Sequence, residues 1–250
     1  MSESPDRPAT GLLEAIRFLT IIPLPGLPPM NEQSVARAIP WFPAAGLVIG
    51  GAMVAVDAVA RPLWGNLVAA VLAVATWGIV TGGLHLDGVS DTFDAVMSWR
   101  SRERKLEIMK DSRIGAMGAI ALIMIILLKV AFIASATVAW PALLLAPMLG
   151  RWADCYGIYR FPPAREGGLG RMFNSYVQQR DLWFSSVLML GSAWLIAGLA
   201  GIIAAALVLA VAHLLARWWV HDLGGLTGDT YGALCEIGEV VALAALTIRI

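Results

Sequence analysis

The chain has 250 residues, of which 58% are hydrophobic and only 14% are charged, and its mean hydropathy is +0.73. Soluble domains contain about 25% charged residues, so this composition excludes an ordinary soluble globular protein. The 18 basic and 18 acidic residues give a formal net charge of +0, which excludes a polybasic nucleic-acid-binding chain. Cys155 and Cys235 lack the spacing of a zinc site or a disulfide framework, and we expect buried thiols.

Uncharged stretches predict an all-α integral membrane bundle. The first 20 residues do not have the pattern of a cleavable signal peptide. A helix needs about 20 apolar residues to cross a bilayer, and the candidate stretches are residues 38–56, 62–84, 114–128, 130–150, 182–212 and, more weakly, 233–248. We expect a turn at Gly198–Gly201 to divide the fifth stretch. The sequence therefore predicts six or seven transmembrane helices in a single domain, residues 1–250.

Basic residues alternate between the two ends of these expected helices. Six lie between the second and third stretches and five between the fourth and fifth, whereas the turns near Ser135 and Gly198 contain none. Basic loops tend to stay in the cytoplasm. We therefore expect both long loops and the N-terminus on the cytoplasmic side.

The densest polar motif, GGLHLDGVSDTFDA (residues 82–95), follows the second stretch. Asp87, Asp91 and Asp94 are spaced i, i+4 and i+7, so a helix would present all three carboxylates on one face. Mg²⁺ is commonly held by one or two carboxylates together with substrate phosphates, and Gly88 would let a phosphate approach the backbone. The alternative is a solvated amphipathic helix neutralised by the basic loop that follows. We favour a metal site, because charges are costly at the end of an apolar helix.

Polar residues beside this motif are further candidates. His85 could act as a general base, a metal ligand or a hydrogen-bonding neighbour of the acids. Lys110 and Arg113 could bind phosphate oxygens through charge-assisted hydrogen bonds. Asp111 and Arg113 lie immediately before the third stretch, near the expected height of the aspartates, and are candidates for that reason. We expect the other basic residues of this loop, Arg102 among them, to serve mainly as cytoplasmic anchors.

A second polar motif, HDLGGLTGDTYGALCEIGE, occupies residues 221–239. Gly225, Thr227 and Asp229 belong to a glycine-rich loop whose backbone could approach a phosphate. Structural glycines at a tight turn would also explain this loop. They would not explain Glu236, an acid within the last apolar stretch, so we interpret the motif as functional.

Two further groups of charges leave alternatives open. The middle loop, RFPPAREGGLGRMF, contains Arg171 and suits an anionic ligand or a solvated loop equally well. Asp57, Lys129 and Asp154 interrupt apolar regions, where charges need partners. A carrier would also place charges inside its helices, so a proton- or cation-coupled membrane carrier is the alternative from another functional class.

Together these segments resemble the adenosylcobinamide-GDP ribazoletransferase family, also called cobalamin-5'-phosphate synthases. The resemblance runs nearly end to end, and its landmarks are FLTIIPLP, WFPAAGLVIG, GGLHLDGVSDTFDA, KLEIMKDSRIGAMG, EGGLGRMF and GGLTGDTYGALCEIGE. It implies a transferase of cobalamin (vitamin B12) biosynthesis in the bacterial cytoplasmic (inner) membrane. Such an enzyme joins adenosylcobinamide-GDP to alpha-ribazole or its 5'-phosphate, releases GMP and requires Mg²⁺.

The resemblance also suggests roles for the residues above. The three aspartates would place the metal ion and the diphosphate, and one of them or His85 would accept the proton of the attacking hydroxyl. Asp111, Arg113 and Asp229 form a second group of substrate-binding residues, and Glu236 is an additional candidate metal ligand.

The aspartate motif is also similar to that of the CDP-alcohol phosphotransferases, although its spacing, DGxxDxxD, matches their pattern only in part. A lipid-head-group phosphotransferase therefore stays as an alternative beside the carrier. The expected partners are the two substrates and the lipid bilayer, without nucleic acid, and a homo-oligomer is compatible with the sequence.

Overall fold

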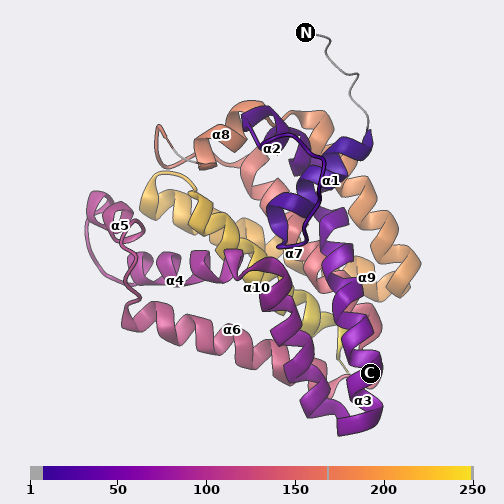
Figure 1. Cartoon of the computed structure of the whole chain (residues 1–250). Helices are drawn as coiled ribbons and strands as arrows, with labels where there is room; N and C mark the ends of the chain where they lie inside the picture. Colours follow the sequence, from indigo (N-terminus) through magenta and orange to yellow (C-terminus); the bar gives the residue numbers. More distant parts are fainter. Residues whose placement is uncertain (1–7, 168, 249–250) are drawn as a thin grey trace.

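The computed structural model describes residues 8–167 and 169–248, which form helices joined by loops, with no extended sheet in this part of the chain (Figure 1). The helices are α1 (Pro8–Leu19), α2 (Glu32–Ala38), a short 3-10 helix (Ile39–Trp41), α3 (Phe42–Thr81), α4 (Leu84–Val96), α5 (Arg102–Ile108), α6 (Ala116–Ser135), α7 (Trp140–Arg160), α8 (Leu169–Tyr176), α9 (Gln179–Leu223) and α10 (Gly228–Leu246). The predicted all-α class is confirmed for these residues.

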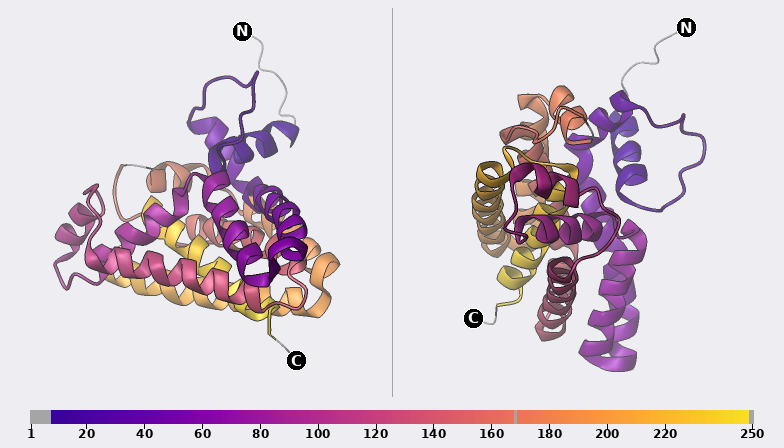
Figure 2. Two further views of the ribbon diagram at one scale, coloured as in Figure 1. Left: turned by 60° about the horizontal axis from the view of Figure 1, so that its bottom comes forward. Right: turned by 90° about the vertical axis from the view of Figure 1, so that its left-hand side faces the viewer.

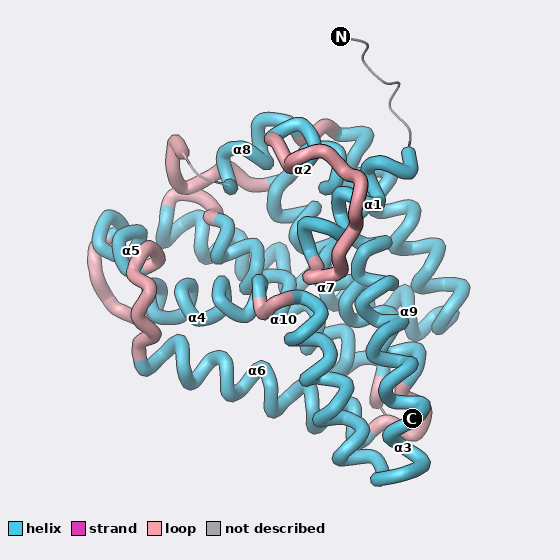
Figure 3. The backbone as a smooth tube through the Cα atoms, in the orientation of Figure 1, coloured by secondary structure: helices cyan, strands magenta, loops and turns pink. Residues whose placement is uncertain are grey.

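The two longest helices, α3 and α9, each consist of two halves joined at a glycine. Gly65 has φ 80° and Gly198 has φ 55°, a backbone region that glycine adopts without steric cost. Figure 3 shows α3 doubling back on itself at its bend. In α9 the halves come so close that a Cβ on Gly201 would overlap the backbone of Ala193. The predicted turn at the start of Gly198–Gly201 is therefore confirmed.

The turn between the first two predicted transmembrane helices lies later in the chain than the sequence predicts. Asp57 and Arg61, which separate the first two apolar stretches in the sequence, form an ion pair of 2.8 Å between Oδ1 and Nη2 inside α3. Because the two charges satisfy each other one turn apart, they do not interrupt the helix. The chain reverses at Gly65 instead.

A similar pairing lets α6 continue through Lys129, where the sequence separates two apolar stretches. The ammonium group lies 2.6 Å from Oε2 of Glu236 and also contacts Glu239, both on α10. Arg151 of α7 contacts the other carboxylate oxygen of Glu239. All four side chains are buried, so each charge has an opposite charge where no water reaches it.

The loops and turns are divided between the two ends of the bundle. The connections from α3 to α6, from α7 to α9 and from α9 to α10 lie at one end, and α1 and α2 sit over it (Figure 2). Ala136, Ala197 and Leu246 line a shared cavity at the opposite end, where the chain makes its short turns. The site described below lies at the end with the long loops.

Three segments of the described chain are long and apolar enough to cross a membrane: Glu32–Thr81, Ala116–Ser135 and Gln179–Leu223. Large apolar side chains project from them, among them Leu195, which is 85% exposed. A soluble monomer rarely exposes such a surface. The fold is that of a helical membrane protein.

Candidate active site

The three aspartates of the predicted motif lie on α4, and α10 adds Asp229 beside them. The i, i+4, i+7 spacing of the aspartates is realised because Leu84–Val96 is helical, as predicted. Burial raises the pKa of Asp91 to about 7, and the charges of Asp87 and Asp229 contribute to this shift. Asp94 contributes less. Four carboxylates from two helices thus share one region at the end of the bundle.

Small residues bring α4 and α10 together. A Cβ on Gly88 would lie 2.6 Å from the carbonyl oxygen of Asp229, and one on Gly232 would lie 3.2 Å from Cα of His85. The sequence predicts that a phosphate approaches Gly88, but on this side of Gly88 the backbone of α10 occupies the space. The close contact between the two helices holds Asp229 next to the aspartates of α4.

Asp94 differs from the other aspartates because both of its oxygens already have partners. One accepts a hydrogen bond from the backbone N–H of Gly115 (2.7 Å) and the other from that of Gly118 (2.8 Å). These donors belong to the first turn of α6, whose N–H groups have no partner within the helix. Asp94 therefore fixes α6 against α4, and Asp87 and Asp91 are left as the freer carboxylates.

The chemistry of this donor set fits a hard divalent cation. Asp87, Asp91 and Asp229 supply carboxylate oxygens, which Mg²⁺ prefers, and their mutual repulsion would be relieved by positive charge. The alternative of a helix neutralised by the basic loop is not supported by the contacts of that loop. Lys105 pairs with Asp222 (2.6 Å), and Arg104 pairs with Glu107 (2.7 Å).

The loop before α6 carries an ion pair between Asp111 and Arg113 at the protein surface. Asp111 accepts hydrogen bonds from Arg113, at 2.6 Å from Nη2, and these bonds lower the pKa of Asp111 to about 2. The Arg113 side chain is 87% exposed, and Lys110 is exposed too. Both cations are accessible to an anionic substrate, as is Arg171 on α8.

The glycine-rich loop before α10 is built mainly by contacts with the middle loop. The backbone N–H of Leu226 donates to the carbonyl of Pro162 (2.8 Å), and the N–H of Ala164 donates to the carbonyl of Leu226 (2.8 Å). A Cβ on Gly225 would lie 2.5 Å from the backbone of Ala164. Gly225 is therefore required where the two loops approach each other.

Thr227 forms the N-cap of α10 and also contacts the acid that follows it. Its hydroxyl accepts from the backbone N–H of Thr230 and lies 3.2 Å from Oδ2 of Asp229, to which it donates. Arg165 of the middle loop acts electrostatically on Asp229. The sequence of the middle loop, which contains Arg165, suits an anionic ligand and a solvated loop equally well. The effect of Arg165 on Asp229 depends on the pairing of the two loops.

Arg102, which the sequence predicts to be mainly a cytoplasmic anchor, also makes specific contacts within the protein. Its guanidinium donates to the carbonyl of Leu223 (2.7 Å) at the end of α9 and to that of Ala164 (3.2 Å). Lys105, on the next turn, is buried against Asp222. The basic helix α5 thus joins the end of α9 to the middle loop.

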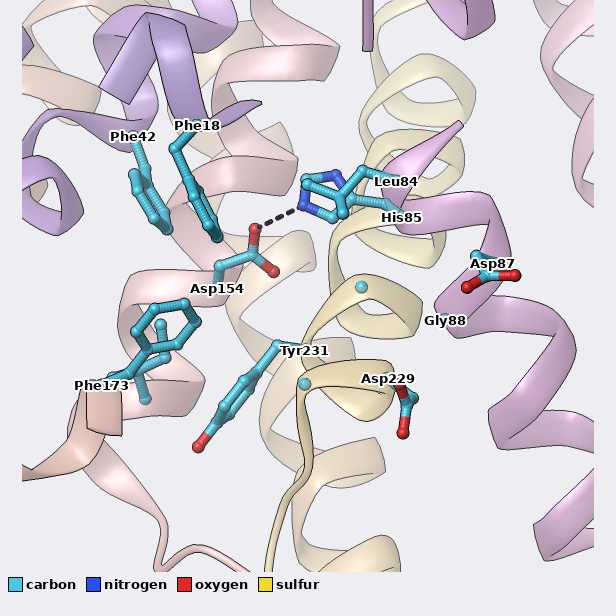
Figure 4. A pocket seen from close by; sticks show the side chains of 13 residues that line it. Phe18, Phe42, Leu84, His85, Asp87, Gly88, Asp154, Phe173, Asp229 and Tyr231 are labelled. Carbon is cyan, nitrogen blue, oxygen red and sulfur yellow. Dashed lines mark ion pairs between the residues drawn. The ribbon is translucent and has the colours of Figure 1, made fainter. Parts of the chain in front are cut away.

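A cavity of about 230 Å³ lies beside the carboxylates (Figure 4). Aromatic side chains line one side of it, and Asp87, Gly88 and Asp229 lie on the other. His85 and Asp154 stand between these two sides, with 3.6 Å between Nε2 and Oδ2. Burial, then the charge of Arg151, lowers the pKa of His85, so the imidazole is neutral at pH 7.

Most residues of this cavity leave no signal in the sequence. Asp154 stands out there only as a charge that needs a partner, and Phe18, Phe42 and Phe173 carry no pattern that separates them from ordinary core residues. His85, Asp154 and Cys235 also bring their potential ligand atoms within 4.8 Å of one another. Nitrogen and sulfur are not ligands that Mg²⁺ prefers, whereas Asp87, Asp91 and Asp229 offer oxygen atoms alone. Both cysteines are buried free thiols, as expected.

Glu236 does not join the aspartates of α4. Its carboxylate is paired with Lys129 on α6, within the buried charge group described above. The sequence reveals that an acid lies in an apolar helix, but it does not reveal which neighbouring helix supplies the partner. The structure thus gives Glu236 an ion-pairing role in the bundle.

Comparison with known proteins connects this arrangement to one family. The family model described as cobalamin-5-phosphate synthase matches residues 11–247. A protein from Roseiflexus sp. (strain RS-1), named adenosylcobinamide-GDP ribazoletransferase, is 64% identical over 94% of this chain and 88% of its own length. Proteins of the same name are 54% identical in Herpetosiphon aurantiacus (94% of this chain and 95% of the relative) and 41% identical in Desulforamulus reducens (90% and 91%).

No solved structure matches the chain. The family match covers α3 to α10 in full, and it includes the aspartates of α4 and the glycine-rich loop before α10. This chain belongs to the cobalamin-5-phosphate synthase family.

Proposed function

We propose that this protein transfers adenosylcobinamide phosphate from adenosylcobinamide-GDP to alpha-ribazole or alpha-ribazole 5'-phosphate. The products are adenosylcobalamin or its 5'-phosphate and GMP. The observation that carries the proposal is the match to the family and its named relatives along nearly the whole chain. The carboxylate group and the adjoining cavity supply the kind of site that this phosphoryl chemistry needs.

The reaction forms one bond to phosphorus and breaks another. A ribose hydroxyl of the ribazole attacks the phosphorus atom that is linked to cobinamide, and the bond from this phosphorus to the bridging oxygen breaks. The bridging oxygen leaves with GMP, and the hydroxyl proton passes to a base. Negative charge on the phosphoryl oxygens increases during transfer, so cationic groups placed around them lower the barrier.

We assign Asp87, Asp91 and Asp229 to holding Mg²⁺, with Asp94 holding α4 in position against α6. When bound, the cation would neutralise charge on the diphosphate oxygens. Asp87 and Asp91 are also candidates for accepting the hydroxyl proton, because neither is fixed by backbone N–H groups as Asp94 is. His85 is neutral and lines the adjoining cavity, which makes it the third candidate base.

Basic side chains around this region are assigned to the phosphates. Arg113 and Lys110 extend from the loop before α6, and Arg171 extends from α8. Their exposure makes all three side chains accessible to a large anionic substrate, and Arg113 would exchange its pair with Asp111 for paired hydrogen bonds to phosphate. Thr227 and Gly225 shape the loop that presents Asp229.

We further propose that the protein spans the bacterial cytoplasmic membrane six or seven times, with the active site at the cytoplasmic end. The two halves of α3, the two halves of α9, and α6, α7 and α10 supply seven helical segments. The basic residues of the long loops lie at the same end as the aspartates, which favours a cytoplasmic site.

The test uses detergent-purified protein with adenosylcobinamide-GDP and alpha-ribazole 5'-phosphate, and it measures GMP release and corrinoid product with Mg²⁺ and with EDTA. We expect joining only with Mg²⁺. Product formation at full rate in EDTA would contradict the metal assignment and leave the transferase intact. Absence of product in both conditions, from folded protein, would contradict the transferase, and CDP-alcohol substrates would then be assayed.

A further inference from the structure

We propose that the cavity beside the carboxylates holds the planar aromatic base of the acceptor nucleoside. This inference rests on the proposed function, and it assigns the 5,6-dimethylbenzimidazole ring of alpha-ribazole to the space between Phe173, Tyr231 and Asp154. The ribose would then extend toward Asp87 and Asp229.

The first observation is the composition of the cavity wall. Phe18 and Phe42 are stacked with ring centroids 5.8 Å apart and planes at 8°, and Phe173 meets Phe18 edge to face at 5.8 Å. All three rings line the cavity, together with Tyr231 of α10. Aromatic rings on several sides of a space favour a flat aromatic ligand, since both stacked and edge-on contacts are then available.

The second observation is that several polar atoms around this cavity make no hydrogen bond, although Nε2 of His85 lies 3.6 Å from Oδ2 of Asp154. Nδ1 of His85, both carboxyl oxygens of Asp154 and the hydroxyl of Tyr231 are buried without a hydrogen-bond partner among the described residues. Asp154 is only 2% exposed and Tyr231 only 3%. Buried polar atoms are normally paired. A ligand with a polar ring atom would give one of these groups a hydrogen-bond partner.

The third observation is the volume of the cavity. A cavity of about 230 Å³ is smaller than the roughly 300–1,000 Å³ of sites that enclose whole ligands. It suits one bicyclic ring of the substrate and excludes the corrin macrocycle, which must lie outside. The ribose would then lie toward Asp87 and Asp229, which line the side of the cavity away from the phenylalanines.

The dimethylbenzimidazole fits this wall better than guanine, the other flat base in the reaction. Guanine has acceptors at O6 and N7 and a donor at N2, and those that face the phenylalanines and not Asp154, His85 or Tyr231 would stay unpaired at a cost in binding. Dimethylbenzimidazole has two methyl groups and a single ring nitrogen that is free of the sugar. It therefore presents an apolar edge to the phenylalanines and one acceptor to the tyrosine hydroxyl or to His85.

The inference is tested by equilibrium binding of alpha-ribazole and of GMP to purified protein, and by the KM of each substrate. Phe173→Ala should weaken alpha-ribazole binding about tenfold, the size expected for loss of one stacked ring, and leave GMP binding unchanged. Phe173→Leu, which keeps most of the side-chain volume, should behave in the same way if the ring itself is required. Tyr231→Phe should weaken alpha-ribazole binding by about two- to tenfold.

Phe184→Ala is the matched control, since Phe184 is 43% exposed and packs against Trp41 outside the cavity. It should change neither binding constant. Weaker GMP binding with unchanged alpha-ribazole binding in Phe173→Ala would overturn the assignment in favour of guanine. Equal losses for both ligands, or no loss for either, would also overturn it.

The two proposals fail in different ways. Suppose that the wild-type protein binds alpha-ribazole, that Phe173→Ala binds it more weakly, and that the wild-type protein forms no corrinoid product. The proposed function is then wrong, and the assignment of the cavity to the base stands. If product forms normally and the KM for alpha-ribazole is unchanged in Phe173→Leu, the function stands and the base cavity is wrong.

Discussion

Oδ1 of Asp94 accepts a hydrogen bond of 2.8 Å from the backbone N–H of Gly118, so an acid at the end of α4 holds the first turn of α6. A side chain on Gly118 would collide with Asp94 and with Ser90. The absence of a side chain at residue 118 is thus what lets the two helices meet. Asp94 and its neighbour Asp91 should consequently respond differently to the same substitution.

Asp94→Asn should lower stability by about 1–2 kcal/mol, because it removes a charge from the positive end of α6 and replaces one acceptor oxygen with an amide donor. Asp91→Asn should leave thermal stability unchanged or raise it, since it removes a carboxyl crowded by other acids, and should abolish turnover. Thermal unfolding in detergent and GMP release measure the two effects. Full turnover in Asp91→Asn would contradict the metal assignment.

Gly88→Ala should separate α4 from α10, because the added methyl group would lie 2.6 Å from the carbonyl oxygen of Asp229. We expect a loss of about 1–3 kcal/mol and a higher Mg²⁺ concentration for half-maximal rate. Gly78→Ala on α3 is the control, because nothing lies within 4 Å of its Cβ position, and it should be neutral or stabilising. If Gly88→Ala and Gly78→Ala have the same stability and the same Mg²⁺ requirement, the contact at Gly88 does not limit how closely α4 packs against α10.

Arg102→Gln should be damaging, whereas Arg104→Gln should be mild. Arg102 donates to backbone carbonyls of α9 and the middle loop, and losing bonds from a charged donor costs about 1.5–3 kcal/mol. Arg104 makes only an exposed pair with Glu107, of a kind worth about 1 kcal/mol or less. Thermal unfolding of both variants compares them directly, and a mild Arg102→Gln would return this residue to the role of a charged anchor.

Lys129→Met should destabilise the protein by about 3–5 kcal/mol, because it leaves Glu236 buried without a cation and Glu239 with Arg151 as its remaining partner. Glu236→Gln should lower stability without changing the Mg²⁺ concentration that supports half-maximal turnover. A specific rise in that concentration for Glu236→Gln, at unchanged stability, would restore Glu236 to the metal ligands.

The sequence predicted the features that depend on local pattern. The helix of the aspartate motif, the break at Gly198 and the end of the bundle that gathers the long loops all follow from spacing, glycine and charge distribution. It did not predict contacts between distant segments. Asp154 meets His85 across α7 and α4, and Arg102 meets Leu223 across 121 residues, so neither relationship leaves a local signal.

Lys129 ends an apolar stretch of the sequence without ending a helix, and α6 continues to Ser135, near which the sequence predicts the turn. An isolated lysine in an apolar run is costly in a membrane, and only its partners on α10 remove that cost. The aromatic wall of the cavity was missed because phenylalanines contributed by α1, α3 and α8 look like any other buried residues until the helices are assembled.

The pairing of Lys129 with Glu236 also bears on how the protein is made. The two residues are 107 positions apart, so α6 leaves the ribosome long before the helix that neutralises it. Until α10 is inserted, Lys129 has to stay near the lipid headgroups or within the insertion machinery. During that time α6 cannot adopt its final depth in the membrane. Chains that stop before α10 should for this reason be extracted and degraded, even though most of their helices are complete.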